Sequence, residues 1–216
     1  MRRLLFLVAA AIGLTPGCVP YAVGTTPSTV SERAIEPSAV LQVTSGRRDI
    51  GVDTEPGGAG LMLGNEARIG LDERSDIGVR IIGFGSMTAT YKRRLTGALG
   101  QEAGAAVMVG AGIIGTSHLH VEATVVASPG PLEGFPRIVP YGGVRLQDLT
   151  PFSNDALGTP TALGVFVGGR FGWPDLSVSP ELGLFYSPSP LLGDDDVIIV
   201  PSVTVRGDRL RRALGL

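Results

Sequence analysis

The sequence predicts an all-β protein, an antiparallel up-and-down meander of about eight to ten strands that closes into a β-barrel. From Ser38 onward, apolar residues recur at every second position, which is the period of a strand with one apolar face. The 32 glycines and 16 prolines among 216 residues supply turns between short elements. Closure into a barrel removes the two edge strands that an open sheet of this size would expose.

The clearest element is a hairpin formed by residues 66–71 and 76–81, joined by 72–75. Successive side chains of a strand point to opposite faces, so the hairpin has one apolar and one charged face. The apolar face contains Ala67, Ile69, Leu71, Ile77, Val79 and Ile81, and the other contains Glu66, Arg68, Asp76 and Arg80 with two glycines.

The same alternation predicts strands along the rest of the body, with a break at Gly83-Phe84-Gly85. These strands cover residues 39–44, 86–94, 104–114, 117–127, 137–147, 162–171, 178–187 and 197–205. Together with the hairpin they make about ten strands.

The N-terminus has the features of an export signal: Met1-Arg2-Arg3 is positively charged and Leu4 to Leu14 is an apolar run. Eleven apolar residues are too few for a permanent transmembrane helix, which needs about 20. Residues Leu14-Thr15-Pro16-Gly17-Cys18 resemble a bacterial lipoprotein signal, and the resemblance implies that Cys18 is the lipid attachment site. Cleavage by the ordinary signal peptidase is the alternative, because Thr15 stands where such signals usually carry Leu.

This interpretation divides the chain into four parts. They are a signal peptide (1–17), a lipid anchor with an extended linker (18–37), a β-barrel (38–206) and a C-terminal tail (207–216).

Composition excludes several classes of function. A formal charge of −2 lacks the electrostatic footprint expected of a nucleic-acid binder, and one cysteine with two histidines excludes intramolecular disulfides and Cys-rich zinc sites. Residues 110–115 match a dinucleotide fingerprint, but an alternating strand follows where a helix is required. No G-x-S-x-G elbow surrounds a serine. We therefore expect no catalytic residues, no cofactor and no metal.

The charged face is expected to line the barrel as a polar network. The network comprises Glu66, Arg68, Asp76, Arg80, His118, His120, Glu122 and Glu181. His118, His120 and Glu122 share one face of a strand, and a polar row paired with arginines is favoured there over a metal site, which needs three converging ligands and outer-shell support. Glycine on this face suits a crowded interior better than a solvated surface. With this number of strands, the wall side chains are expected to fill the interior.

The sequence also resembles small bacterial outer-membrane β-barrel proteins. The resemblance lies in the charged and apolar alternation of 66–71 and 76–80, and in the segments 139–144, 179–184 and 200–205. It implies a non-enzymatic cell-envelope protein whose partner is the lipid of the outer membrane.

A lipid-anchored soluble periplasmic barrel that binds a small hydrophobic ligand is the alternative. The chain continues past Arg206 without the terminal aromatic residue usual in spanning barrels, and it has only 12 aromatic residues. The two hypotheses differ in which face is buried. A spanning barrel exposes Ile69, Val79, Val121 and Leu184, whereas a soluble barrel buries them and exposes Arg68 and Arg80.

Overall fold

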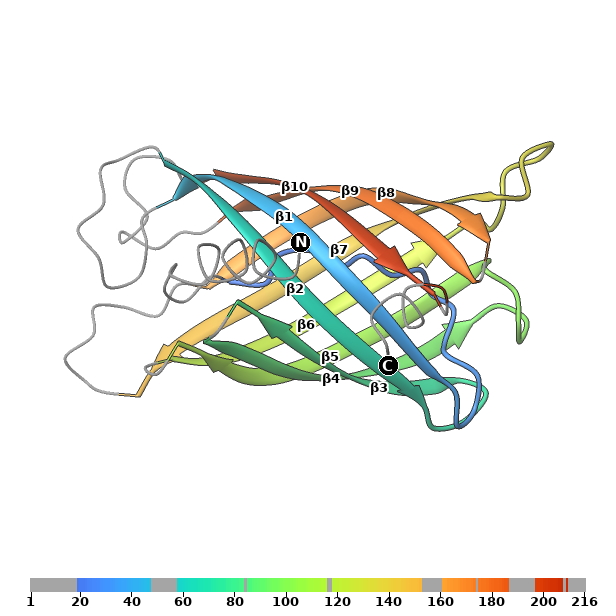
Figure 1. Cartoon of the computed structure of the whole chain (residues 1–216), viewed down its shortest axis with the longest axis horizontal. Coiled ribbons are helices and arrows are strands. Elements are labelled where there is room, and N and C mark those ends of the chain that lie inside the picture. Colours follow the sequence, from blue (N-terminus) through green and yellow to red (C-terminus); the bar gives the residue numbers. More distant parts are fainter. Residues whose placement is uncertain are drawn as a thin grey trace, which may run out of the picture.

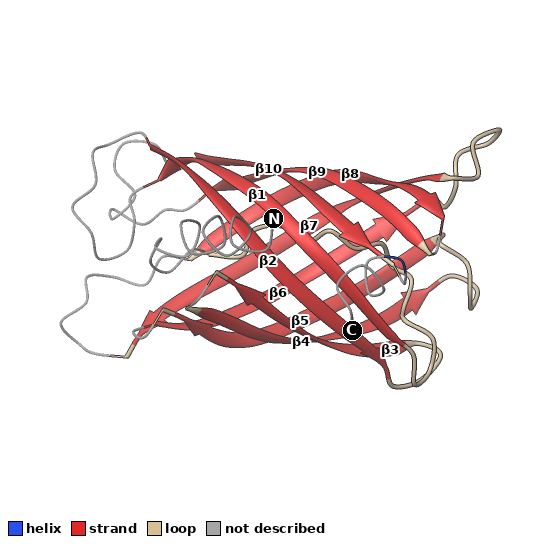
Figure 2. Ribbon diagram, viewed as in Figure 1, coloured by secondary structure: helices blue, strands red, loops and turns tan. Residues whose placement is uncertain are grey.

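The computed structural model is a closed antiparallel barrel of ten strands in the described part of the chain, which confirms the predicted fold class (Figures 1 and 2). The structure describes residues 19–47, 58–83, 85–115, 118–152, 161–173, 175–186, 197–207 and 209. The strands are β1 (Ile35–Arg47), β2 (Gly58–Gly70), β3 (Ser75–Ile82), β4 (Ser86–Thr96), β5 (Gly104–Ile114), β6 (His118–Ser128), β7 (Ile138–Pro151), β8 (Ala162–Trp173), β9 (Leu176–Tyr186) and β10 (Val197–Arg206).

Each strand pairs with the next along the chain, and β10 pairs with β1 to close the ring. We call the end of the barrel at which β1 begins and β10 ends the turn mouth. The opposite end, at which β1 ends and β2 begins, is called the loop mouth. Among the described residues, no helix is long and apolar enough to cross a membrane.

The register of β2 and β3 confirms the predicted hairpin. Ile69 lies opposite Ile77 and Ala67 opposite Val79, while Glu66 lies opposite Arg80 on the other face. Because the ring is closed, the face that carries Glu66 and Arg80 encloses the lumen, and both side chains are buried.

The outer surface of the barrel is an apolar belt to which every strand contributes exposed side chains. Val79 is 47% exposed and Leu182 is 45% exposed, whereas Arg68 on the inner face is 1% exposed. The belt includes Leu41, Leu63, Ile69, Val79, Met87, Val109, Val121, Leu146, Val165, Leu182, Leu184 and Ile199.

Glycines on the inner face make room for the longest side chains of neighbouring strands. Gly78 lies opposite Arg68, and a Cβ at position 78 would stand 2.8 Å from Arg68 Nη1. Gly110 lies opposite Glu122, and a Cβ there would stand 2.9 Å from Glu122 Cγ. Glycine was expected on the inner face because the lumen is crowded. The distances show why, since any larger residue at these positions would collide with a neighbouring side chain.

The structure differs most from expectation in residues 19–30, which were expected to form part of an extended linker outside the barrel. They lie inside the lumen and contact the walls, and we call them the plug (Figure 1). The plug starts at the loop mouth, where Val19 and Tyr21 pack in a buried cluster with Ile114 and Phe185. It reaches the turn mouth at Val30.

A tight turn then reverses the chain into β1, which begins at Ile35 rather than at residue 39. Ala34 N–H donates to Ser31 O (2.9 Å), and Arg33 N–H donates to Gly70 O of β2 (2.9 Å). A Cβ at Gly70 would stand 2.1 Å from Ser31 O, so this turn packs directly on the β2 backbone.

The plug fits because the inward side chains are short on one side of the lumen and long on the other. β9, β10 and β1 present several small polar side chains to the lumen beside a few larger ones such as Gln42, Glu181 and Phe185. The small ones are Ser177, Ser179, Ser202, Thr204, Ser38 and Thr44. The long charged side chains come mainly from β2, β3, β4, β6 and β7. The space beside β9, β10 and β1 is filled by the plug as well as by side chains of the wall. This corrects the expectation that wall side chains alone would fill the interior.

The predicted signal peptide and Cys18 lie outside the described residues, as does most of the predicted tail.

Candidate functional site in the barrel lumen

A first cluster of buried charges is centred on Arg68 of β2. Its guanidinium donates to Glu66 Oε1 through Nη1 (2.5 Å) and to Asp76 Oδ1 through Nε (2.8 Å) and Nη2 (2.5 Å). The second carboxylate oxygen of Glu66 accepts from Arg80 Nη2 (3.0 Å). Lys92 Nζ lies 3.7 Å from Asp76 Oδ2. Two acids from β2 and β3 are thus paired with three bases from β2, β3 and β4, which leaves one positive charge in excess on this wall.

Pairing in the folded chain explains how so many charges are buried. An unpaired buried ion costs several kcal/mol, whereas a hydrogen-bonded pair recovers much of that cost. Glu66 lies directly opposite Arg80, and Asp76 lies directly opposite Lys92. The strand register therefore places each acid beside a base.

A second cluster lies on β6 and β7. Arg145 Nη2 donates to Glu122 Oε2 in a close ion pair. His120 Nε2 lies 3.2 Å from Gln147 Oε1, and its Nδ1 lies 3.4 Å from Thr88 Oγ1. His120 is thus held by neutral partners as well as by Glu122, whose Oε2 lies 3.6 Å from Nε2.

Three buried polar atoms of this second cluster on β6 and β7 are left without a protein partner within the described part of the chain. Glu122 Oε1, Arg145 Nε and Gln147 Nε2 are buried and have no hydrogen-bond partner among the described residues. Buried polar atoms of this kind are normally satisfied by ordered water.

Glu181 of β9 binds the backbone of the plug. Val23 N–H donates to its Oε1 and Gly24 N–H to its Oε2, both at 2.8 Å. Gly24 has a φ of 59°, and a Cβ there would stand 2.0 Å from Thr204 Oγ1. Position 24 therefore requires glycine for two reasons: its φ is positive, and a Cβ atom would collide with Thr204.

The opposite wall binds the carbonyl groups of the plug. Ala22 O accepts from Arg80 Nη1 (2.9 Å) and from Arg145 Nη1 (3.1 Å), so one carbonyl joins the two charge clusters. Lys92 Nζ donates to Ser28 O (2.5 Å) and to Thr26 O (3.3 Å).

Seven of the eight residues predicted to line the lumen are buried on the inner face, and His118 is half-buried at the start of β6. They do not form one group. Glu66, Arg68, Asp76 and Arg80 lie together, His120 lies with Glu122, and Glu181 binds the plug. Glu66 pairs with arginines, whereas Glu181 binds backbone N–H groups of the plug. The described residues contain no cluster of three or more His, Cys, Asp or Glu side chains able to hold a metal ion.

The plug and the role of Lys92 in holding it were not predicted from the sequence. A signal for the plug is present in Val19, Tyr21 and Val23, which alternate like a strand. The prolines, glycine and threonines around them favour a linker instead. Lys92 is the single lysine of the sequence and is 1% exposed.

At the turn mouth, Glu102 between β4 and β5 joins the plug to β8. Its carboxylate accepts from Thr26 Oγ1 (2.8 Å) and pairs with Arg170 Nη1 (2.5 Å). Burial of Glu102 opposes its ionisation, but Arg170 and the Thr26 and Ser28 hydroxyls outweigh this effect. The pKa of Glu102 therefore lies below its ordinary value.

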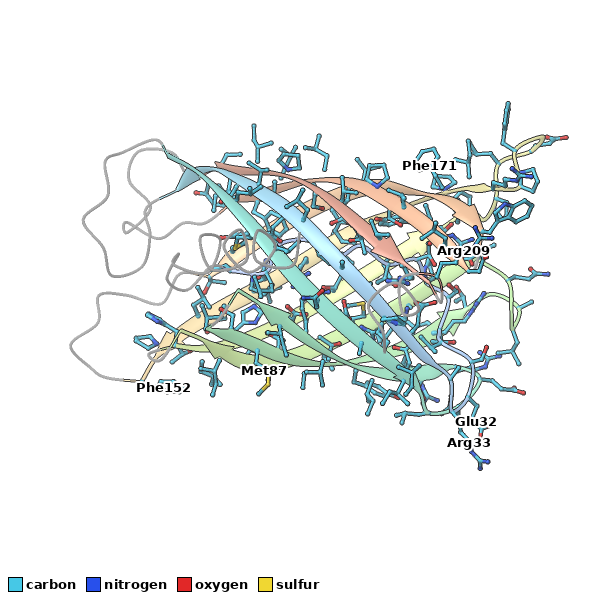
Figure 3. All side chains as sticks on the ribbon, viewed as in Figure 1. Glu32, Arg33, Met87, Phe152, Phe171 and Arg209 are labelled. Carbon is cyan, nitrogen blue, oxygen red and sulfur yellow. The ribbon has the colours of Figure 1, made fainter. Side chains whose placement is uncertain are left out.

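Exposed aromatic side chains lie at both ends of the belt. Phe171 and Trp173 lie near the turn mouth, and Phe152 and Tyr186 near the loop mouth. Figure 3 shows Phe152 and Phe171 at opposite ends of the barrel. Arg137 Cζ lies 3.9 Å above the Trp173 ring. Aromatic rings at two levels are typical of the two interfaces of a bilayer.

Comparison with known proteins gives structural likenesses alone, since no family model and no curated protein matches the chain. Neisserial surface protein A is similar at 13% identity and a TM-score of 0.37, over 81% of this chain and 95% of that chain. The outer membrane protein OprG from Pseudomonas aeruginosa is similar at 14% identity and a TM-score of 0.35, over 82% and 95%. The N-terminal β-barrel domain of Pseudomonas aeruginosa OprF is similar at 11% identity and a TM-score of 0.33, over 82% and 99%. Likenesses this weak support no inference about function.

The Glu122–Arg145 pair gives a testable coupling. Arg145→Met is expected to lower the free energy of unfolding by about 3–5 kcal/mol, because it leaves the Glu122 charge buried without its partner. The double variant Arg145→Met/Glu122→Gln is expected to lose clearly less than the sum of the two single variants. Urea unfolding in lipid vesicles measures all four proteins, and additive losses would contradict the pairing.

Glu102 gives a testable pH dependence. Its pKa is lowered in the folded state, so its contribution to stability is present above the unfolded pKa of about 4.3 and is lost as pH falls through the folded pKa. Glu102→Gln should therefore lose less stability than the wild type when urea midpoints at pH 7 and pH 3 are compared. Glu133→Gln, which removes an exposed carboxylate, is the matched control and should behave as the wild type.

Proposed function

We propose that this chain is a non-enzymatic β-barrel of the bacterial outer membrane whose strands span the bilayer. The observation that supports this most strongly is the distribution of its two faces. Apolar side chains such as Val79, Val121 and Leu184 are exposed around the outside, while Arg68 and Arg80 are buried inside. A spanning barrel needs this arrangement because hydrocarbon surrounds it.

The length of the strands fits the thickness of a membrane. Strand β9 has 11 residues. At about 3.3 Å per residue and a tilt of roughly 40°, such a strand rises about 27 Å along the barrel axis. The apolar band of outer-membrane barrels is about 25 Å tall. The aromatic side chains at both ends of the belt also support a barrel whose axis crosses the membrane.

The soluble alternative requires the opposite distribution of side chains. A soluble barrel with an apolar cavity would bury Ile69, Val79, Val121 and Leu184, whose exposed fractions are 40–47%. It would also place Arg68 and Arg80 in solvent. The exposed belt therefore favours the spanning barrel. Its buried charges are held in ion pairs and hydrogen bonds, and a structural or interaction role fits this arrangement better than catalysis.

We also propose that Cys18 is acylated and is the first residue of the mature protein. The apolar run before it and the lipoprotein-like segment 14–18 support this proposal. Val19, its neighbour, packs in the buried cluster at the loop mouth. An acyl chain on Cys18 would accordingly have to reach lipid from that mouth.

The bilayer position of the belt is testable with two matched substitutions. Leu182→Lys places a charge near the middle of β9 and is expected to cost about 2–4 kcal/mol of unfolding free energy in lipid vesicles. Leu132→Lys changes a leucine of nearly equal exposure in the β6–β7 connection, outside the strands, and is expected to cost under about 0.5 kcal/mol. Equal and small effects would contradict a spanning barrel.

The substitution Cys18→Ser distinguishes a protein held by its lipid anchor from one held by strands that span the bilayer. If the strands hold the protein in the bilayer, this variant should stay with outer membranes after carbonate and high-salt washing, whereas release would contradict spanning. Intact-mass measurement of the wild type tests the anchor. A mass equal to an unmodified chain would contradict acylation.

A further inference from the structure

The plug is built as a separate body inside a complete barrel. The ten strands close through their own backbone pairing, from β1–β2 to β1–β10. Residues 19–30 contribute no strand to this sheet, and their contacts with the wall include many hydrogen bonds to wall side chains. The wall thus does not depend on the plug for its ladder, and the plug can leave without opening the sheet.

Cationic side chains hold the plug by its carbonyl oxygens along the lumen. Arg80 and Arg145 share Ala22 O, Arg206 donates to Gly24 O (3.0 Å), and Lys92 donates to Thr26 O and Ser28 O. A carbonyl oxygen carries a partial negative charge, so it occupies the position that an anion would take beside these groups. The plug oxygens therefore trace a row of anion positions from the middle of the lumen to the turn mouth.

The buried charges of the inner wall include more bases than acids, which favours the binding of anions over cations in the lumen. Apart from His120, the buried ionisable side chains of the described residues include five bases and four acids. The bases are Arg68, Arg80, Lys92, Arg94 and Arg145, and the acids are Glu66, Asp76, Glu122 and Glu181. Removal of the plug takes carbonyl partners from Arg80, Arg145 and Lys92, whereas Glu66 and Glu122 keep their arginine partners.

The row of cations leads into a cavity at the turn mouth. This cavity has a volume of about 490 Å³. Three arginines, Arg94, Arg170 and Arg206, line it together with four glutamates, Glu32, Glu36, Glu73 and Glu102. Residues 28–31 form part of its lining, so the end of the plug separates the cavity from the lumen.

We propose that the lumen is a passage for small hydrophilic anions and that residues 19–30 close it. This inference rests on the proposed function, because conduction requires a barrel that spans a bilayer. Glu181 and Gly24 are the residues that keep the passage closed. Glu181 holds two consecutive N–H groups of the plug, and Gly24 allows the backbone to approach Thr204.

Two substitutions in the full-length protein loosen the plug at different points. Glu181→Gln replaces a carboxylate that accepts two N–H groups by a neutral amide with one acceptor oxygen. Gly24→Val places a Cβ where Thr204 Oγ1 stands and introduces a branched residue at a positive φ. Glu133→Gln removes the same charge from an exposed loop and serves as the control for Glu181→Gln.

Conductance in planar bilayers is the main measurement, made in potassium chloride on protein purified from cell envelopes. Wild type and Glu133→Gln are expected to be mostly closed. Glu181→Gln, Gly24→Val and their combination are expected to raise the mean conductance at least about tenfold, with a reversal potential that favours chloride. Adding Lys92→Gln to Gly24→Val should reduce the preference for chloride, because it removes one cation from the row.

Labelling relates conductance to the position of the plug. Thr25→Cys in a Cys18→Ser background should react slowly with a membrane-impermeant maleimide, because residue 25 is 3% exposed. The reaction should be at least about tenfold faster when Gly24→Val is added. If folded Glu181→Gln, Gly24→Val and the double variant all conduct no more than the wild type, the passage is overturned. A potassium preference would overturn its assignment to anions.

Membrane retention of the same variants keeps this inference separate from the proposed function. The retention assay is made in the Cys18→Ser background, so that a lipid anchor does not hold the protein. Variants in this background that stay in carbonate-washed membranes and do not conduct overturn the passage alone. Release of the Cys18→Ser protein from those membranes overturns the spanning barrel, and the passage with it.

Discussion

Closure of a two-faced sheet is the constraint on which the rest of this structure depends. When ten strands with alternating apolar and polar side chains form a ring, the polar face is removed from bulk solvent and the apolar face becomes the whole outer surface. Each buried charge then needs a partner within the ring. The antiparallel register supplies such partners directly, as in the opposition of Glu66 and Arg80.

The size of the inner side chains decides what else the ring contains. Long charged groups reach inward from β2, β3, β4, β6 and β7, and glycines such as Gly78 and Gly110 make room for them. Serine and threonine on β9, β10 and β1 leave space beside the opposite wall. The plug fills that space, and its backbone links the two charge clusters through Ala22 O. The lumen is thus an assembly of two walls with a peptide between them.

The wall and the plug of the barrel are held together by different interactions. Ion pairs buried in a protein add little net stability, because desolvation offsets much of their attraction, but they disfavour alternative registers that would separate the charges. The plug is held differently, by side chains that bind its peptide groups. The wall itself is held by the backbone pairing of its ten strands.

Local pattern in the sequence determined the fold class, the approximate positions of the ten strands and the assignment of residues such as Arg68 and Val79 to opposite faces. The reason is that the two-residue period of a strand is a property of neighbouring residues. The tertiary structure alone decided which acids pair with which bases, and that residues 19–30 lie within the lumen. Those features depend on contacts between segments far apart in the chain, such as Val23 with Glu181, and on the space that remains once the ring has closed.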